Sequence, residues 1–452
     1  MMKTKNRIFF YLGLVFFYFL IFLSPSKIIY FSAYFVSTFF FYLFCKNIRV
    51  SLLYSLVLSL FSEIGLAGSL FIMEPKELNM GSGWWVSPMT ILIILLLPLS
   101  IRKKNENIKQ PDYFVIIFYT ISAFSLLIFP YTNSLLGFLT LTEVILVYYI
   151  LRSQMNNNNL KNIIFIIISM LFFQSILGSF QINLKKTVGS ISESMSVDRP
   201  YGITTAEEEN LFRISGTFGH PNLFAAFLLV SIPFINTLTK AKSFIKIILY
   251  FLSFIILFFT FTRVAWLIGI IYLFIYFFAL RNINIKLACY RIFILMFIIL
   301  LFIISPYLQA RITSFSPAFD EFGSMGVRFK LFSESMNLIN QYPLLGVGIN
   351  RSLEIYASFP VTNLFENVPK SGFYRIHNTA LEIGTEMGLL GLLSLIRFMI
   401  FVLWSFLKDK NNLKKKAAVV SLLGLIAISM FNPFFHSSIF RYFFLLSAII
   451  LI

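Results

Sequence analysis

Apolar runs alternate with short polar or charged segments along most of the chain. The runs are continuously apolar and do not alternate with period two, which favours membrane-spanning helices over the strands of a barrel. Several are shorter than the roughly 20 residues that a helix needs to cross a bilayer, so some are expected to be parts of one broken helix. The pattern therefore predicts about 12–14 transmembrane helices. The candidate spans are 8–23, 28–45, 50–73, 86–101, 113–130, 135–151, 163–180, 222–239, 247–262, 264–280, 288–306, 385–407, 417–432 and 437–452.

The composition excludes an ordinary soluble protein. Hydrophobic residues make up 58% of the chain and charged residues 12%, and 57 residues are phenylalanine. Soluble proteins carry about 25% charged residues, so this chain has too few polar side chains to cover a water-facing surface. We expect an all-α polytopic membrane protein. Its two cysteines, Cys45 and Cys289, lie far apart in the sequence and predict neither a disulfide nor a metal site.

The distribution of basic residues predicts the orientation of the spans. More than half of the 37 lysines and arginines fall in alternate loops, which are the cytoplasmic loops if the N-terminus is cytoplasmic. The short loops on the other side hold few basic residues, in keeping with the positive-inside rule. We therefore predict cytoplasmic N- and C-termini. We interpret the net charge of +18 as a result of the basic residues in the cytoplasmic loops, and we predict no nucleic-acid partner.

Two segments on the predicted outer side are long and charged. They divide the chain into N-terminal transmembrane helices (1–180), a first extracytoplasmic loop (181–221), further transmembrane helices (222–306), a large extracytoplasmic loop (307–384) and C-terminal transmembrane helices (385–452). Long loops inside a compact protein are usually functional. We therefore expect the chemistry on the extracytoplasmic face.

The sequence RISGTFGHPNLFAAF at 213–227 predicts a bent entry into a helix. Pro221 suits the first turn of that helix. The exposed N–H groups of a helix start, together with the nearby Arg213, favour an anion. The alternative interpretation is an ordinary loop-to-helix turn with an interfacial arginine, and composition alone leaves both open.

Arg263, in FTRVAWLIG, lies between two apolar runs with almost no loop. A charge so close to hydrocarbon costs roughly a few kcal/mol unless its side chain reaches the headgroups or finds a partner. Arg263 is therefore either a lipid-facing arginine or a guanidinium that binds a phosphate through two parallel hydrogen bonds.

A third candidate, HNTALEIGTEMGLLGLL, follows the large loop. His377 and Asn378 open a predicted helix, in which Gly384 and Gly388 form a face of small residues for close packing. A histidine in a loop is most often simply solvated. Imidazole is also the commonest general base near neutral pH, so His377 is a candidate catalytic residue.

Other polar residues predict structural roles. Glu63, Glu143 and Arg397 lie within predicted spans and are expected to pair with one another. His436 is expected at the membrane interface. None of the three histidines has metal-ligand spacing, so no metal site is predicted.

Taken in order, RISGTFGHPNLFAAF, FTRVAWLIG, PLLGVGIN and HNTALEIGTEMGLLGL resemble the O-antigen ligase and O-antigen polymerase superfamily over residues 213–393. The resemblance implies a multi-spanning, GT-C-like glycosyltransferase of the bacterial inner membrane, with its active site on the periplasmic or extracellular side. Such enzymes move a glycan from undecaprenyl pyrophosphate to an acceptor hydroxyl. They use no metal or other cofactor, and attack opposite the leaving group predicts inversion at the anomeric carbon.

The resemblance also implies roles for individual residues. His377 matches the catalytic histidine, and Arg213 and Arg263 match positions that bind the donor pyrophosphate. Asn378 and Glu386 are alternative candidates for orienting the histidine. Supporting roles are expected for His220, Asn222, Arg328, Arg375, Asn378 and Glu386.

The subclass and the acceptor stay open at this point. A ligase and a polymerase use the same donor, and the acceptor is lipid A core, another glycan or a protein. The alternative function is a lipid-linked oligosaccharide flippase or another polysaccharide transporter. A transporter is expected to show internal repeats and polar groups near the bilayer midplane. Here the polar residues are concentrated in the two outer loops, which favours the enzyme.

Overall fold

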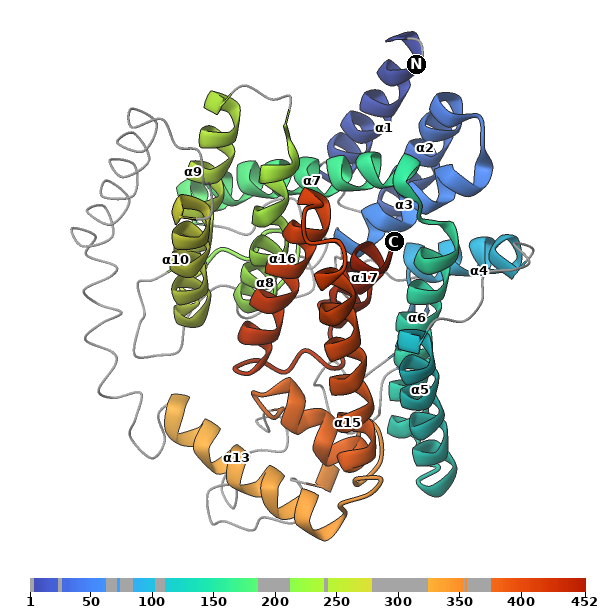
Figure 1. Cartoon of the computed structure of the whole chain (residues 1–452), viewed down its shortest axis with the longest axis vertical. Coiled ribbons are helices and arrows are strands. Elements are labelled where there is room, and N and C mark those ends of the chain that lie inside the picture. The colour runs from blue at the N-terminus through green and yellow to red at the C-terminus, as the bar shows by residue number, and fades with distance from the viewer. Residues whose placement is uncertain are drawn as a thin grey trace, which may run out of the picture.

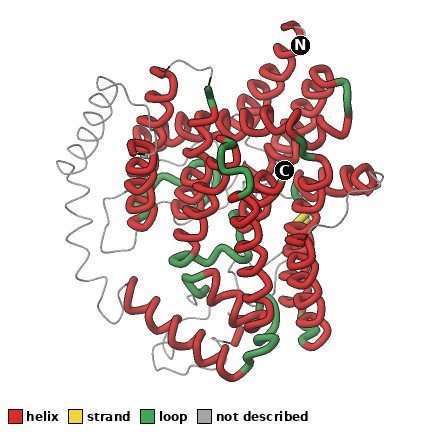
Figure 2. Tube along the Cα trace, in the orientation of Figure 1, coloured by secondary structure: helices red, strands yellow, loops and turns green. Residues whose placement is uncertain are grey.

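The computed structural model describes residues 4–22, 27–61, 71–73, 84–101, 110–185, 212–239, 243–278, 324–352, 354–355 and 375–452. Within these ranges the chain is almost entirely helical, as predicted (Figures 1 and 2). The predicted span at 288–306, Glu63 and parts of both predicted outer loops lie outside the described residues.

Seven described helices precede the first predicted outer loop, and the remaining helices follow it. The first group is α1 (Thr4–Phe22), α2 (Lys27–Cys45), α3 (Ile48–Phe61), α4 (Pro88–Ile101), α5 (Gln110–Ile128), α6 (Thr132–Gln154) and α7 (Asn157–Leu184). The second group is α8 (Pro221–Ser231), the 3-10 helix η4 (Ile232–Thr237), α9 (Ser243–Phe259), α10 (Arg263–Phe278), α13 (Ser324–Gln341), α15 (Thr379–Leu407), α16 (Leu413–Ser429) and α17 (Phe440–Leu451).

Many of these helices are apolar enough for a bilayer. In the described part of the chain, α2, α5, α6, α7 and α15 are also long enough to cross a membrane, and seven further apolar helices are shorter. Multiple apolar helices of this kind are typical of a multi-pass membrane protein.

A short hairpin departs from the all-helical prediction. Strand β1 (Phe71–Met73) pairs with strand β2 (Trp84–Val86) in antiparallel register, with Ile72 opposite Trp85. Residues 71–73 are thus a strand and not the end of a helix over 50–73, because α3 ends at Phe61. Aromatic and β-branched residues suit strands as well as apolar helices, so hydropathy alone did not separate the two.

Helix α8 lies in the interior of the bundle. It contacts α7, α9, α10 and α16, and its apolar side chains from Phe224 to Val230 are fully buried. In Figure 1, α7 crosses the upper part of the view, and α16 lies beside α8. A helix that is apolar all round belongs in the interior, and this position fixes the N-terminal end of α8.

Helix α15 is bent at Gly388, whose backbone has φ 66° and ψ −173°. A β-carbon at this position would lie 2.2 Å from the carbonyl oxygen of Leu344, so only glycine fits. The turn at 343–350 packs against the bend through backbone hydrogen bonds, including Leu389 N–H to the carbonyl of Pro343 at 2.8 Å and Val347 N–H to the carbonyl of Thr385 at 2.9 Å.

The close packing expected at the two glycines thus has two different causes. Gly384 lies against Ile339 of α13, whereas Gly388 breaks the helix. Helix α15 begins at Thr379, before the boundary expected at residue 385, and α13 lies within the segment expected to be the large loop. In Figure 1, α13 lies below the bundle, beside the first turns of α15.

Candidate functional site

The segment that carries Arg213 is held by two glutamines of α7. Gln181 Oε1 accepts hydrogen bonds from the N–H groups of Ser215 and Gly216, at 3.2 and 2.9 Å, and its Nε2 donates to the carbonyl of Gly216 at 2.9 Å. Gln174 likewise accepts from the backbone N–H of Thr217 through its Oε1 and donates to the hydroxyl of Thr217 through its Nε2. Both glutamines are fully buried. Because unpaired backbone groups are costly in apolar surroundings, these amides hold the segment in one conformation.

Arg213 is bound to the segment that leads into α10. Its Nε donates to the carbonyl of Thr260 at 2.9 Å, and its Nη2 donates to Asn222 Oδ1 at 3.1 Å and to the hydroxyl of Thr262 at 3.3 Å. The side chain is half-buried. These three contacts hold the guanidinium in one orientation.

A chain of hydrogen bonds joins the N-terminal ends of three helices. The hydroxyl of Thr262, just before α10, donates to Oδ1 of Asn222 in the first turn of α8 at 3.0 Å. Nδ2 of Asn222 donates to Oδ1 of Asn432 at 2.8 Å. The hydroxyl of Thr379, the first residue of α15, donates to the carbonyl of Asn432 at 2.7 Å. The positive ends of three helix dipoles therefore lie close together, which favours an anion.

Arg263 belongs to the same end of the bundle. It is the first residue of α10, directly after Thr262, and it is half-buried. Through Thr262 its backbone is tied to both Arg213 and Asn222. The structure therefore brings the starts of the two predicted arginine motifs together, although fifty residues separate them in the sequence.

His377 lies two residues before α15, with its Nδ1 2.9 Å from the carbonyl oxygen of Arg375. A carbonyl oxygen can only accept, so Nδ1 carries the hydrogen of the neutral ring and the lone pair is on Nε2. Desolvation, followed by the positive charge of Arg328, lowers the pKa of His377 to about 4, against the opposing effect of the bond to Arg375. The ring is therefore neutral at pH 7 with a basic nitrogen. Asn378 caps α15, accepting from Leu381 N–H at 3.1 Å.

His220 is the N-cap of α8, and its Nδ1 accepts from the N–H of Asn222 at 3.1 Å. The side chain reaches the surface, but the protein around it removes much of its hydration. This desolvation, followed by the positive charge of Arg213 and by that of His377 when its ring is protonated, lowers the pKa of His220 to about 4. The imidazole of His220 therefore lies close enough to both side chains to be affected by their charge. We refer to Arg213, His220, Asn222, Arg263 and His377 as the cationic cluster.

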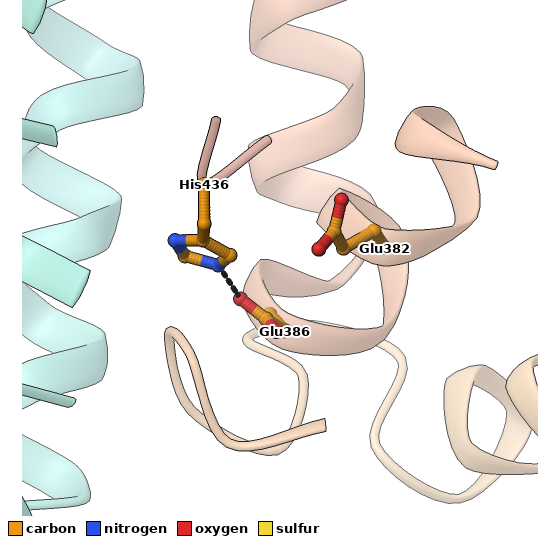
Figure 3. A group of neighbouring side chains, drawn as sticks. All are labelled: Glu382, Glu386 and His436. Carbon is orange, nitrogen blue, oxygen red and sulfur yellow. Dashed lines mark hydrogen bonds and ion pairs between the residues drawn. The ribbon is translucent and has the colours of Figure 1, made fainter. Parts of the chain in front are cut away.

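A second polar group lies along the first turns of α15. Glu382 accepts from Arg375 Nη1 at 3.1 Å and from Phe435 N–H at 3.2 Å. Arg375 Nη2 also donates to Asn350 Oδ1 at 2.9 Å. Figure 3 shows the imidazole of His436 pointing at Glu386, with Nε2 and Oε2 2.6 Å apart.

Glu386 is bonded on both oxygens. It accepts from the N–H of Asn350 and from the hydroxyl of Ser352, each at 2.6 Å, as well as contacting His436. We call these residues the saturated network: Asn350, Ser352, Arg375, Glu382, Glu386 and His436.

The geometry of the saturated network also suggests a metal site. Ligand atoms of Glu382, Glu386 and His436 all lie within 4.8 Å of one another (Figure 3). Each of the four carboxylate oxygens, however, already accepts a hydrogen bond from protein, and Arg375 supplies a positive charge beside Glu382. These groups therefore hold the 350–352 turn and the 434–436 segment against α15 without needing an ion.

One predicted pairing is corrected by these contacts. Glu386 orients His436 and the 350–352 turn, and the group bonded to His377 Nδ1 is the carbonyl of Arg375. The side chain of His436 is 6% exposed and contacts Glu386. Its carboxylate partner fixes it in the interior.

Glu143 also has a partner different from the one expected. Its Oε2 lies 3.6 Å from Nη2 of Arg441, and its Oε1 accepts from the hydroxyl of Thr90 at 2.7 Å. Arg397 is exposed on α15. The apolar stretch of sequence around each charged residue indicated burial but not which helices lie side by side.

The structure thus divides the predicted site residues into two groups. Arg213, His220, Asn222, Arg263, His377 and Asn378 lie at the joined helix starts, and Arg328 acts on His377 through its charge. Arg375 and Glu386 belong to the saturated network.

Several residues that build this end of the bundle were missed by sequence reasoning: Gln174, Gln181, Thr262, Thr379 and Asn432. The glutamines carried one usable signal, because two amides spaced seven residues apart lie on one face of an apolar helix. Asn432 carried none, since its partner Asn222 is more than two hundred residues away.

Comparison with known families finds a match to part of the chain. Residues 248–396 match the family described as O-antigen ligase. The matched range contains Arg263, His377 and the first turns of α15, whereas Arg213, His220 and Asn222 precede it. No curated protein matches the chain.

Proposed function

The family match supports assignment of the chain to the O-antigen ligase and polymerase family, and on that premise we propose that it transfers a glycan from undecaprenyl pyrophosphate to an acceptor hydroxyl. One observation carries this proposal. The N-terminal ends of α8, α10 and α15 meet beside Arg213 and Arg263, and a neutral imidazole stands at the same place. A pyrophosphate needs several fixed donors and positive charges, and a transfer reaction needs a base close by.

In the proposed reaction the acceptor oxygen attacks the anomeric carbon of the donor glycan. A new carbon–oxygen bond forms as the bond from the anomeric carbon to the pyrophosphate oxygen breaks, and the electron pair stays on that oxygen. The proton of the acceptor hydroxyl moves to Nε2 of His377, the nitrogen that bears the lone pair. Attack from the side opposite the leaving group inverts the anomeric configuration.

Arg213 and Arg263 stabilise the leaving undecaprenyl pyrophosphate. Negative charge grows on the pyrophosphate as the bond breaks, and guanidinium groups bind phosphate oxygens through paired hydrogen bonds. Arg213 is held rigidly by its contacts to Thr260, Thr262 and Asn222, so it needs no reorganisation when the charge develops. The proposed reaction is therefore metal-independent.

The proposed setting is the outer face of a bacterial inner membrane. The polyprenyl chain of the donor would lie among apolar helices, and its pyrophosphate would reach the helix starts that face the predicted outer side. The acceptor is lipid A core, another lipid-linked glycan or a protein. A ligase would give a single capped acceptor, and a polymerase would give a ladder of chain lengths.

The test is a transfer assay with the full chain in vesicles that contain undecaprenyl-pyrophosphate-linked glycan and a candidate acceptor. His377→Ala should lower transfer about 10²–10⁴-fold, the range that one general base contributes, without changing the melting temperature. His377→Asn is the matched variant. Its amide can still donate to the Arg375 carbonyl, but it lacks the basic nitrogen, so it should be equally inactive.

Full activity in His377→Asn would remove the base role from this residue. A wild-type chain that moves the lipid-linked glycan across the vesicle membrane without joining it to an acceptor would replace the transferase with the flippase.

A further inference from the structure

The two histidines of the cationic cluster are held in opposite tautomers. Nδ1 of His377 donates to the carbonyl of Arg375, which leaves its lone pair on Nε2. Nδ1 of His220 accepts from the backbone N–H of Asn222, so the hydrogen of its neutral ring is on Nε2. One ring therefore offers a base and the other offers a hydrogen-bond donor.

The ring of His220 and the guanidinium of Arg213 are held by the same residue, Asn222. Asn222 receives the guanidinium of Arg213 on its side-chain oxygen and donates its backbone N–H to His220. Both contacts are made within the first turn of α8, so the ring and the guanidinium are fixed relative to each other.

The chain beside this ring is open among the described residues. The side chain of His220 is exposed, and a β-carbon at the preceding Gly219 would meet no heavy atom of the described residues within 4 Å. Gly219 has φ 70°, which favours glycine, so the chain turns here without filling that space.

We propose that His220 binds the donor pyrophosphate, with its Nε2–H donating a hydrogen bond to a phosphate oxygen beside Arg213. This inference rests on the proposed function and assigns His220 a role different from that of His377. A neutral donor suits this position because a second cation beside Arg213 would add repulsion. The lowered pKa of His220 keeps the ring neutral at pH 7, in agreement with that role.

The experiment separates the two nitrogens of the ring. His220→Asn keeps a side-chain acceptor at the N-cap, a favoured residue there, but has no donor where Nε2 lies. His220→Gln has a longer amide whose NH₂ group reaches the Nε2 position. Binding of undecaprenyl pyrophosphate itself is measured for the full chain in nanodiscs, together with the melting temperature, and the KM for the lipid-linked glycan is measured separately from kcat.

We expect His220→Asn to bind undecaprenyl pyrophosphate about tenfold or more weakly, because a hydrogen bond to a charged group is lost, with an unchanged melting temperature. His220→Gln should recover most of the affinity, and the changes should fall on KM more than on kcat. Should His220→Asn fail to fold, recovery of wild-type affinity in a folded His220→Gln supports the same conclusion.

Wild-type binding in a folded His220→Asn variant would overturn the inference and leave His220 a helix cap. Equal weakening in both folded variants would also overturn it. Failure of the wild-type chain to bind undecaprenyl pyrophosphate at all would instead refute the proposed function.

Discussion

Two groups of polar residues meet at the start of α15, and they differ in the groups that bind and orient their side chains. In the saturated network, His436 and Arg375 each contact a carboxylate, and both oxygens of Glu382 and of Glu386 accept hydrogen bonds. In the cationic cluster, the oriented contacts of Arg213 are made to two hydroxyl-bearing residues and an amide, all neutral. The same residue types thus serve packing in one place and binding in the other.

The difference has an energetic meaning. A buried ion pair whose hydrogen bonds are complete holds segments in a defined arrangement and has little left to offer a ligand. Cations gathered at three helix starts repel one another, and an anionic ligand relieves that repulsion. The presence of a histidine alone therefore does not indicate a catalytic role. The groups that contact its imidazole ring indicate whether it serves packing or catalysis.

The largest expected effect comes from breaking the saturated network. Glu386→Ala leaves His436, Ser352 and the N–H of Asn350 without their acceptor, and each buried polar group left unpaired costs about 1–3 kcal/mol. Thermal unfolding of the full chain should show a clearly lowered melting temperature. The folded fraction should keep its rate of transfer per molecule, because Glu386 lies outside the cationic cluster.

Asp409→Ala is the matched control for this change. Asp409 forms an ion pair with Lys415 in which the side chain of Asp409 is 49% exposed, so its removal should cost about 1 kcal/mol or less. If the Glu386→Ala chain is stable but has lost transfer activity, Glu386 takes part in the reaction. The saturated network and the cationic cluster would then not differ in function.

Much of the fold could be predicted from the sequence because the bilayer imposes its own pattern. A helix that crosses lipid must be apolar over its length, so α2, α5, α6 and α7 lie close to predicted spans. The strand at 71–73 and the bend at Gly388 were missed. Both depend on which backbone segment lies opposite, and hydropathy carries no information about that.

The candidate site was predicted as separate motifs, not as an arrangement. Arg213, Arg263 and His377 stood out because each is a polar residue at the edge of an apolar run. The partner of each charged residue could not be predicted, since Glu143 pairs with Arg441 instead of Arg397, and Asn432 meets Asn222. Pairing across the bundle is a property of tertiary structure.

A smaller effect is expected from loosening the support of the cationic cluster. Gln181→Leu removes the acceptor for two backbone N–H groups, each costing about 1–3 kcal/mol when left buried without a partner. Because Arg213 lies two residues before Ser215, its placement should suffer as well. Binding of undecaprenyl pyrophosphate should weaken by about tenfold even where the chain remains folded.

Asn183→Leu on the same helix provides the control, since Asn183 is exposed and donates to the carbonyl of Ser179 of its own helix. It should leave both stability and binding nearly unchanged. Equal effects of the two substitutions would mean that α7 tolerates no leucine in this region, and the support assigned to Gln181 would then be withdrawn.

The smallest expected effect is a near absence of change on mild acidification. The active form of His377 is the neutral ring, which is present above its pKa and lost below it. With a pKa of about 4, roughly nine-tenths of the ring is still neutral at pH 5, so kcat/KM should stay within about twofold of its value at pH 7. With an ordinary histidine, whose pKa is about 6.5, kcat/KM would fall about 25-fold over the same interval. The pH profile of kcat reports the complex with the donor, whose pyrophosphate favours the protonated ring, so its acid limb should lie at higher pH. Coincident acid limbs in the profiles of kcat/KM and kcat would mean that the pyrophosphate does not bind beside His377. The residues of the cationic cluster would then not form one binding site.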